Sequence, residues 1–103
     1  MKYVISQRCI DNILVFYKNV SKKYKHTYSK ENMRKNVKEA YNAMYLIEKT
    51  LLRRRPTLER WQQEGWHMAH AGKWYYAYSI ADDTITIEDA CHEQNMCDTI
   101  EQQ

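Results

Sequence analysis

The chain has 103 residues, of which 44% are hydrophobic and 28% charged, with only two Gly and one Pro. This composition predicts one globular domain over 1–103 and excludes disordered, collagen-like and low-complexity coiled-coil chains. No run approaches the 18 apolar residues that a membrane span needs. Three Cys and an N-terminal stretch without a secretory signal pattern predict a protein of the reducing cytoplasm, with no membrane partner.

Charge is divided unevenly along the chain. Residues 1–60 hold 15 Lys and Arg against 5 Asp and Glu, whereas residues 61–103 hold 1 against 8. The formal net charge of +3 therefore conceals a basic half and an acidic half. A basic half favours an anionic partner, and it is equally well explained as a solvated helical surface.

The first half of the chain has the pattern of a strand and a helix. A short β-prone run at 2–5 ends at Ser6, a favourable N-cap residue, and a helix is expected over 7–25. Apolar residues recur there at helical spacing, at Ile10, Ile13, Leu14, Tyr17, Val20 and Tyr24.

A second helix is predicted after a turn at 26–29. Ser29 is its candidate N-cap, and the apolar stripe from Met33 to Leu51 extends the helix over 30–52. Three arginines and then Pro56 end it, because the residue before a proline disfavours helical dihedrals. The two helices should therefore pack as a hairpin.

After Gly65 the hydrophobic period changes from 3.6 to 2. Strands are expected over 66–70, 73–80 and 84–90, with turns at 71–72 and 81–83 and a polar tail from about residue 93. The short connections favour an antiparallel meander. We therefore predict an α+β fold in which the helical hairpin packs on one face of a small antiparallel sheet.

Alternation along the middle strand assigns its side chains to two faces. The bulkier row should face the helices and the smaller row should face an open side, where a functional site would lie. The inward row is Trp74, Tyr76, Tyr78 and Ile80, and the outward row is Tyr75, Ala77 and Ser79.

Residues 72–87, GKWYYAYSIADDTITI, followed by His92, carry a family resemblance. An aromatic strand ending in Tyr-x-Ile, an acidic turn, Thr-Ile-x-Ile and then a His resemble the RelE/ParE toxin superfamily of bacterial type II toxin–antitoxin systems. The order of strand, helical hairpin and meander over about residues 2–96 is also similar to that family's fold.

The resemblance implies a small cytoplasmic toxin of a stress or plasmid-stabilization module. It would arrest growth when free of the antitoxin protein that neutralises it. Three alternatives stay open. A RelE-like member would be a ribosome-dependent mRNA endoribonuclease (an mRNA interferase); a ParE-like member would inhibit DNA gyrase without catalysis; a degenerate member would only bind its antitoxin.

The resemblance places two catalytic candidates, His92 and Tyr75. The near-neutral pKa of histidine suits general acid–base work, although the His92 ring could instead pack against Trp or Tyr. RelE-like nucleases commonly carry an Arg where this chain has Tyr75, so the expected phosphate clamp is absent there. Tyr75 could stack on a base or bond a phosphate, or be a half-exposed strand residue.

A second set of candidates would bind nucleic acid. These cations are Arg53, Arg54, Arg55, Arg60 and Lys73. The arginine run is equally well explained as a solvent-exposed helix end. Cys91, His92 and Cys97 lack a nameable fourth ligand, so neither a metal nor another cofactor is expected.

Overall fold

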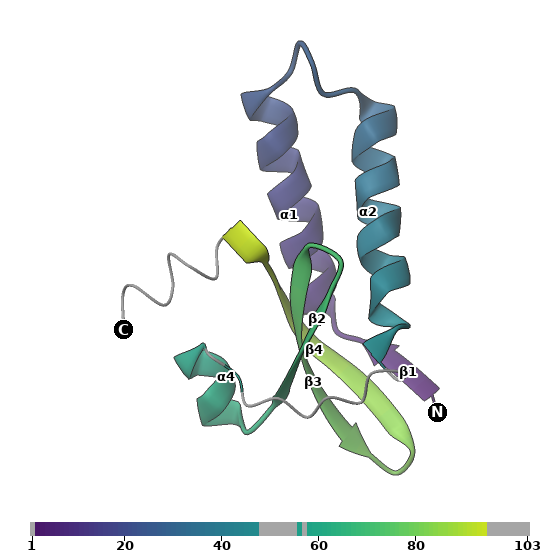
Figure 1. Ribbon diagram of the computed structural model, residues 1–103, viewed down its shortest axis with the longest axis vertical. Coiled ribbons are helices and arrows are strands. Elements are labelled where there is room, and N and C mark those ends of the chain that lie inside the picture. Colours follow the sequence, from purple (N-terminus) through teal and green to yellow (C-terminus); the bar gives the residue numbers. More distant parts are fainter. Residues whose placement is uncertain (1, 48–55, 57, 95–103) are drawn as a thin grey trace.

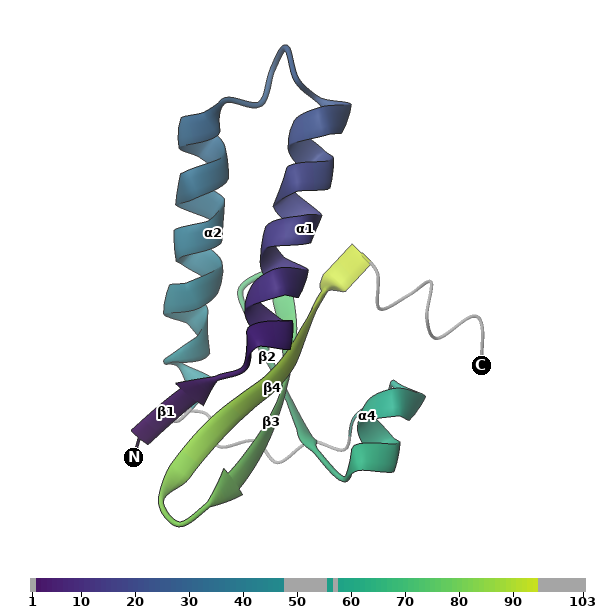
Figure 2. The same ribbon diagram turned by 180° about the vertical axis from the view of Figure 1, so that it is seen from behind.

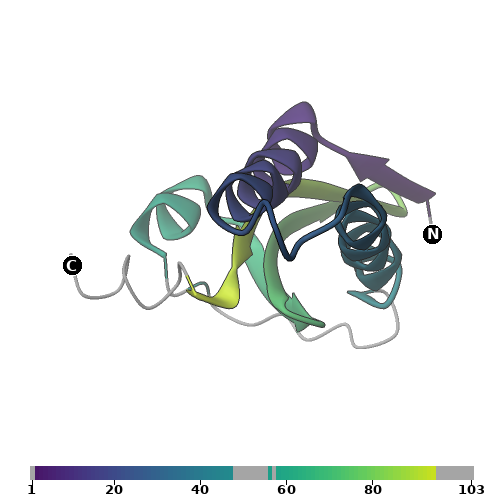
Figure 3. The ribbon, with the colours of Figure 1, turned by 90° about the horizontal axis from the view of Figure 1, so that it is seen from above.

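The computed structural model describes residues 2–47, 56 and 58–94. The element order is β1 (Lys2–Ile5), α1 (Gln7–Lys23), α2 (Lys30–Met44), α4 (Glu59–Glu64), β2 (His67–Ala71), β3 (Trp74–Ala81) and β4 (Thr84–His92). Helices α1 and α2 form the expected hairpin, and its connected end projects well beyond the sheet (Figures 1 and 2). Seen from above, α1 lies between α2 and α4 (Figure 3). The predicted α+β class is confirmed.

The four strands form one mixed sheet in the order β1-β4-β3-β2. Strands β2, β3 and β4 pair antiparallel, as the meander requires. Strand β1 pairs parallel to β4, with Lys2 opposite Thr84 and Ile5 opposite Ile87. The expectation of a purely antiparallel sheet is therefore wrong at this edge, because the chain crosses over through the helical hairpin before it returns beside β1.

Both strand turns are two-residue hairpins. Ala71 pairs with Trp74 around a turn at Gly72 and Lys73, and Gly72 has a φ of +63°. At the second turn Asp82 and Asp83 have φ values of 50° and 61°. Two consecutive positive φ angles match the twist of the flanking strands, and aspartate tolerates this region better than most residues.

The helices begin where expected and end earlier. The Ser6 hydroxyl accepts a hydrogen bond from the backbone N–H of Cys9 at 3.1 Å, and the Ser29 hydroxyl accepts one from Asn32 at 3.1 Å. Helix α1 ends at Lys23 rather than 25. Helix α2 ends at Met44 rather than 52. Beyond it, the backbone N–H groups of Tyr45 and Leu46 donate to the carbonyls three residues earlier, which is the tighter 3₁₀ pattern. Residues 48–52 lie outside the described residues.

The main core fills the space between the hairpin and the sheet. Trp74, Tyr76 and Tyr78 are buried in it, as the alternation predicted. Its other large members are Ile13, Tyr17, Met44, Ile47, Ile85 and Ile87. The Tyr76 hydroxyl donates to the Ala40 carbonyl at 2.6 Å, which satisfies the polar atom inside this apolar layer.

A second, smaller cluster covers the opposite face of the sheet, where helix α4 was not predicted. Its buried members are Leu58, Trp61, Met68, Ala77 and Cys91. The expectation that Ala77 faces an open surface is therefore wrong, since its side chain is fully buried beneath α4. Tyr75 is only partly buried against this cluster.

A β-bulge in β4 decides which side chains near its end face the hairpin. Ala77 pairs with Asp89 while Tyr78 pairs with Ile87, so Glu88 is the additional residue. Without this additional residue, alternation from Ile87 would direct the Asp89 side chain toward the hairpin. The bulge instead turns Ala90 and His92 toward the hairpin.

Candidate functional site

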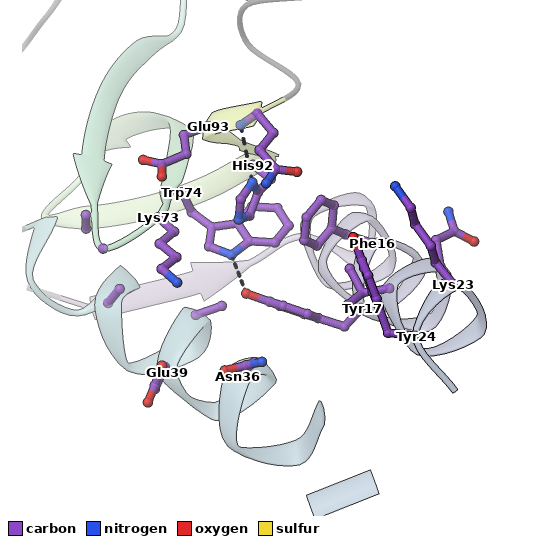
Figure 4. A pocket seen from close by; sticks show the side chains of 17 residues that line it. Phe16, Tyr17, Lys23, Tyr24, Asn36, Glu39, Lys73, Trp74, His92 and Glu93 are labelled. Atoms are coloured by element: carbon purple, nitrogen blue, oxygen red, sulfur yellow. Dashed lines mark hydrogen bonds between the residues drawn. The ribbon is translucent and has the colours of Figure 1, made fainter. Parts of the chain in front are cut away.

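A pocket of about 690 Å³ lies where α1, α2, the β2–β3 turn and the end of β4 meet (Figure 4). Its aromatic walls are Phe16, Tyr17, Tyr24 and Trp74. Its charged and titratable lining residues are Lys23, Glu39, Lys73, His92 and Glu93. Two residues singled out from the sequence, His92 and Lys73, therefore meet in one cavity, which has the size usual for a ligand site.

His92 closes one side of this pocket as a packed ring. It stacks on Phe16 with a centroid distance of 4.1 Å and an interplanar angle of 11°, and it meets Trp74 in a T-shaped contact. Nδ1 accepts a hydrogen bond from the Gln94 backbone N–H at 3.2 Å. Burial lowers the pKa of His92; nearby Lys73 lowers it further, and Glu93 opposes the shift. The neutral ring thus carries its proton on Nε2.

The alternative to a catalytic role, in which the His92 ring packs against aromatic side chains, accounts for its position, because only 5% of the residue is exposed. Its catalytic role stays a prediction. Nε2 is the nitrogen left to meet a ligand, since Nδ1 is already used by the backbone.

Tyr17 and Trp74 fix the inner wall of the pocket. The Trp74 indole N–H donates to the Tyr17 hydroxyl oxygen at 3.1 Å, and both side chains are buried (Figure 4). Burial raises the pKa of Tyr17, and the Trp74 bond partly offsets that shift. The hydroxyl is therefore a neutral group whose own proton is available to donate.

Lys73 lies on the exposed β2–β3 turn at the edge of the pocket. Its carbonyl accepts from the Glu93 backbone N–H at 3.0 Å, which ties the turn to the end of β4. The second pocket cation, Lys23, comes from α1 and lies 5.5 Å from the Tyr24 ring centroid. The two ammonium groups thus belong to different walls of the cavity (Figure 4).

Tyr75 does not share the pocket with His92. Neighbouring strand residues point to opposite faces, so Trp74 lies beside His92 while Tyr75 lies beside Cys91. The Tyr75 ring stacks on His70 with a centroid distance of 4.3 Å. His70 Nε2 lies 3.6 Å from Glu93 Oε2. The structure therefore separates the two catalytic candidates and puts Tyr75 in a different cluster.

The predicted nucleic-acid set is also divided. Arg60 lies on α4, with Nε 3.6 Å from Asp89 Oδ2 and its guanidinium 5.7 Å from the Trp61 ring centroid. Arg60 also lines a second pocket of about 270 Å³ together with His92 and Trp74, so it lies near His92 but outside the 690 Å³ cavity. Arg53, Arg54 and Arg55 lie outside the described residues.

Asp89 is the polar residue that the sequence analysis missed. Its carboxylate accepts from Asn12 Nδ2 at 2.6 Å, from Trp61 Nε1 at 2.8 Å and from the Ala90 backbone N–H at 2.8 Å. It is 2% exposed. These bonds connect β4 to both α1 and α4. Its side-chain partners, Trp61 and Asn12, lie 28 and 77 residues away in sequence, so no local spacing could have indicated them.

The described cysteines are buried thiols. Burial raises the pKa of Cys9 to about 12, with a further contribution from Asp89, and burial also raises that of Cys91. Neither is therefore a thiolate near neutral pH. Cys97 lies outside the described residues, among which no group of three or more His, Cys, Asp or Glu is placed to hold a metal.

No protein-family model matches this chain, and no curated protein matches it significantly. Among the residues that the structure describes, no helix has the length and apolar character needed to cross a bilayer.

Proposed function

We propose that this chain is the toxin of a RelE/ParE-like toxin–antitoxin module and arrests growth when free of its antitoxin. One observation carries the proposal. The segment that bears the resemblance forms the β3–β4 hairpin with its acidic turn, His92 ends β4, and the hairpin of α1 and α2 packs against the same sheet. This is the order and packing that the resemblance implies.

The geometry favours action by binding a target over RNA cleavage. Cleavage through a 2′-hydroxyl needs a base, an acid and a cation on the phosphate within one site. Here His92 is packed and neutral, and Tyr75 lies on the opposite face. Arg60 lines a small pocket with His92, but its guanidinium is paired with the buried Asp89 carboxylate. A non-catalytic toxin of the ParE-like kind, acting on a protein such as DNA gyrase, is therefore the primary proposal.

The endoribonuclease remains the second candidate because of the other cluster. His70 and Glu93 are 39% and 46% exposed in their side chains and lie within 3.6 Å, next to Tyr75. A carboxylate beside an imidazole orients the ring, which is an arrangement used in acid–base catalysis. If RNA is cut, His70 is then a better candidate than His92.

Induced expression in a bacterial host, with primer extension to map mRNA ends, tests both proposals. We expect growth arrest with intact transcripts. Cuts in coding frames would establish the nuclease instead, and they should then disappear in His70→Ala and persist in His92→Ala. His26→Ala, an exposed residue between the two helices, is the matched control. Normal growth with abundant folded protein would contradict the toxin proposal altogether.

A further inference from the structure

The connected end of the helical hairpin carries a dense and unpaired positive charge. Residues 18–38 include eight Lys and Arg but a single acidic residue, Glu31. The cations are Lys18, Lys22, Lys23, Lys25, Lys30, Arg34, Lys35 and Lys38, and all eight are exposed. The ion pairs of the described residues lie elsewhere, at Arg60 and His70. Eight solvated cations without carboxylate partners attract a polyanion.

The pocket of Figure 4 lies directly beside this charge. Lys23 and Tyr24, at the end of α1, belong both to the basic hairpin end and to the pocket lining. Tyr24 is 50% exposed with Lys23 Nζ 5.5 Å from its ring centroid, so the exposed part of the ring can stack on a base beside a cation. Lys73 adds a cation from the turn across the cavity.

The pocket lining has the chemistry to hold a planar group with hydrogen-bonding edges. Aromatic rings form its walls, and Asn36 and Glu39 contribute polar groups from α2. A carboxylate accepts from the exocyclic amino group of a base. Proteins that bind single-stranded nucleic acids combine cationic side chains, which contact the phosphates, with aromatic rings, on which the bases stack. The pocket has cations at its rim and aromatic rings inside.

We propose that this pocket binds one nucleotide of a single-stranded nucleic acid. The base lies among the aromatic rings, its neighbouring phosphates contact Lys23 and Lys73, and the remaining cations of the hairpin end hold the flanking strand. Because Glu39 is an acceptor, cytosine should be preferred to uracil. The site is inferred from the pocket and the charge, so it is tested independently of any toxicity.

The test is titration of the full chain with fluorescein-labelled oligomers of about eight nucleotides, followed by anisotropy at several salt concentrations. The probes are oligo(C) and oligo(U), as RNA and as DNA. In parallel, unlabelled oligo(C) is added to the ¹⁵N-labelled protein, in which the indole N–H signal of Trp74 reports the pocket. Trp61, buried on the opposite sheet face, serves as the internal control signal.

We expect salt-dependent binding, a shift of the Trp74 signal and no shift of the Trp61 signal. Lys23→Gln combined with Lys73→Gln should reduce the slope of log affinity against log salt by about 1.4, or 0.7 for each lost phosphate contact. Lys2→Gln combined with Arg8→Gln removes two exposed cations outside the pocket and should leave the slope unchanged. Whichever oligomer binds more tightly, the RNA or the DNA, identifies the kind of nucleic acid that the pocket is built to hold.

Three results would overturn the proposal: no binding at low salt, binding that leaves the Trp74 signal in place, or equal losses in the two double variants. An oligoglutamate peptide that moves the Trp74 signal as much as oligo(C) would also overturn it, since the surface would then be a site for an acidic protein.

Discussion

The two faces of the sheet are held by different means. On the hairpin face, side chains of α1, α2 and all four strands interlock in one large apolar core. On the α4 face, five buried residues, one of them Trp61 of the six-residue helix α4 itself, form a small cluster. Asp89 adds to it a polar connection through the Trp61 indole. Apolar area determines how much stability a layer contributes, so the hairpin face should dominate global stability and the α4 face should open first.

The largest expected effect is a truncation in the hairpin core. Ile13 and Leu58 are both fully buried, one in each layer. We expect Ile13→Ala to lower the free energy of unfolding by about 2–5 kcal/mol, because the close-packed layer cannot collapse around the cavity. Leu58→Ala should cost less and accelerate hydrogen exchange mainly in α4. Urea unfolding with exchange mass spectrometry checks both, and equal losses with uniform exchange would show that the two faces unfold as one unit.

The second prediction concerns the carboxylate that joins the two faces. Asp89→Ala leaves the buried Trp61 indole N–H without its acceptor and frees Asn12 on α1. We expect a loss of about 1–3 kcal/mol, since a buried donor loses its bond without regaining water. Exchange should become faster in α4 and in the first half of α1, which would distinguish this variant from Leu58→Ala.

Arg60→Gln is the control for Asp89. It removes an ion pair in which the arginine side chain is 52% exposed, so the change should stay within about 1 kcal/mol. A loss as large as that of Asp89→Ala would mean that the Arg60 charge, and not the hydrogen bonds, holds α4 on the sheet.

The buried residues of the hairpin face were predictable from the sequence wherever apolar residues recur with the period of a helix or a strand. The stripe around Ile13 and the alternation of Trp74, Tyr76 and Tyr78 state directly which sides are buried. Ser6 and Ser29 are local signals for helix starts, and both caps are confirmed. Local chemistry is sufficient for such features because the interacting residues lie within one or two turns of each other.

The α4 face was not predictable by the same means. Six residues are too few to display a helical period, and only Gly65, with a φ of +72° at the end of α4, is a local signal. The direction of His92 depends on the bulge at Glu88, which no residue pattern indicates. The separation of His92 from Tyr75 therefore follows from strand pairing in the folded chain. The sequence named both candidate residues but could not show that they lie on different faces of the sheet.

The smallest expected effect is a pH dependence confined to the hairpin face. Burial lowers the pKa of His92 from its ordinary value of 6.5. Below that value the unfolded chain binds a proton that the folded chain does not bind, so stability rises with pH up to about 6.5 and is lost as the solution becomes more acidic. Urea unfolding at intervals between pH 5 and 7 should show this rise.

His92→Phe separates titration from packing in this prediction. The substituted ring can still stack on Phe16 and against Trp74, but it carries no proton, so the pH dependence should become shallower. Because His92 packs with α1, acidification of the unsubstituted chain should also increase exchange in the second half of α1 before it affects α4. An acid-induced opening that begins in α4 would instead show that His92 is not the group responsible.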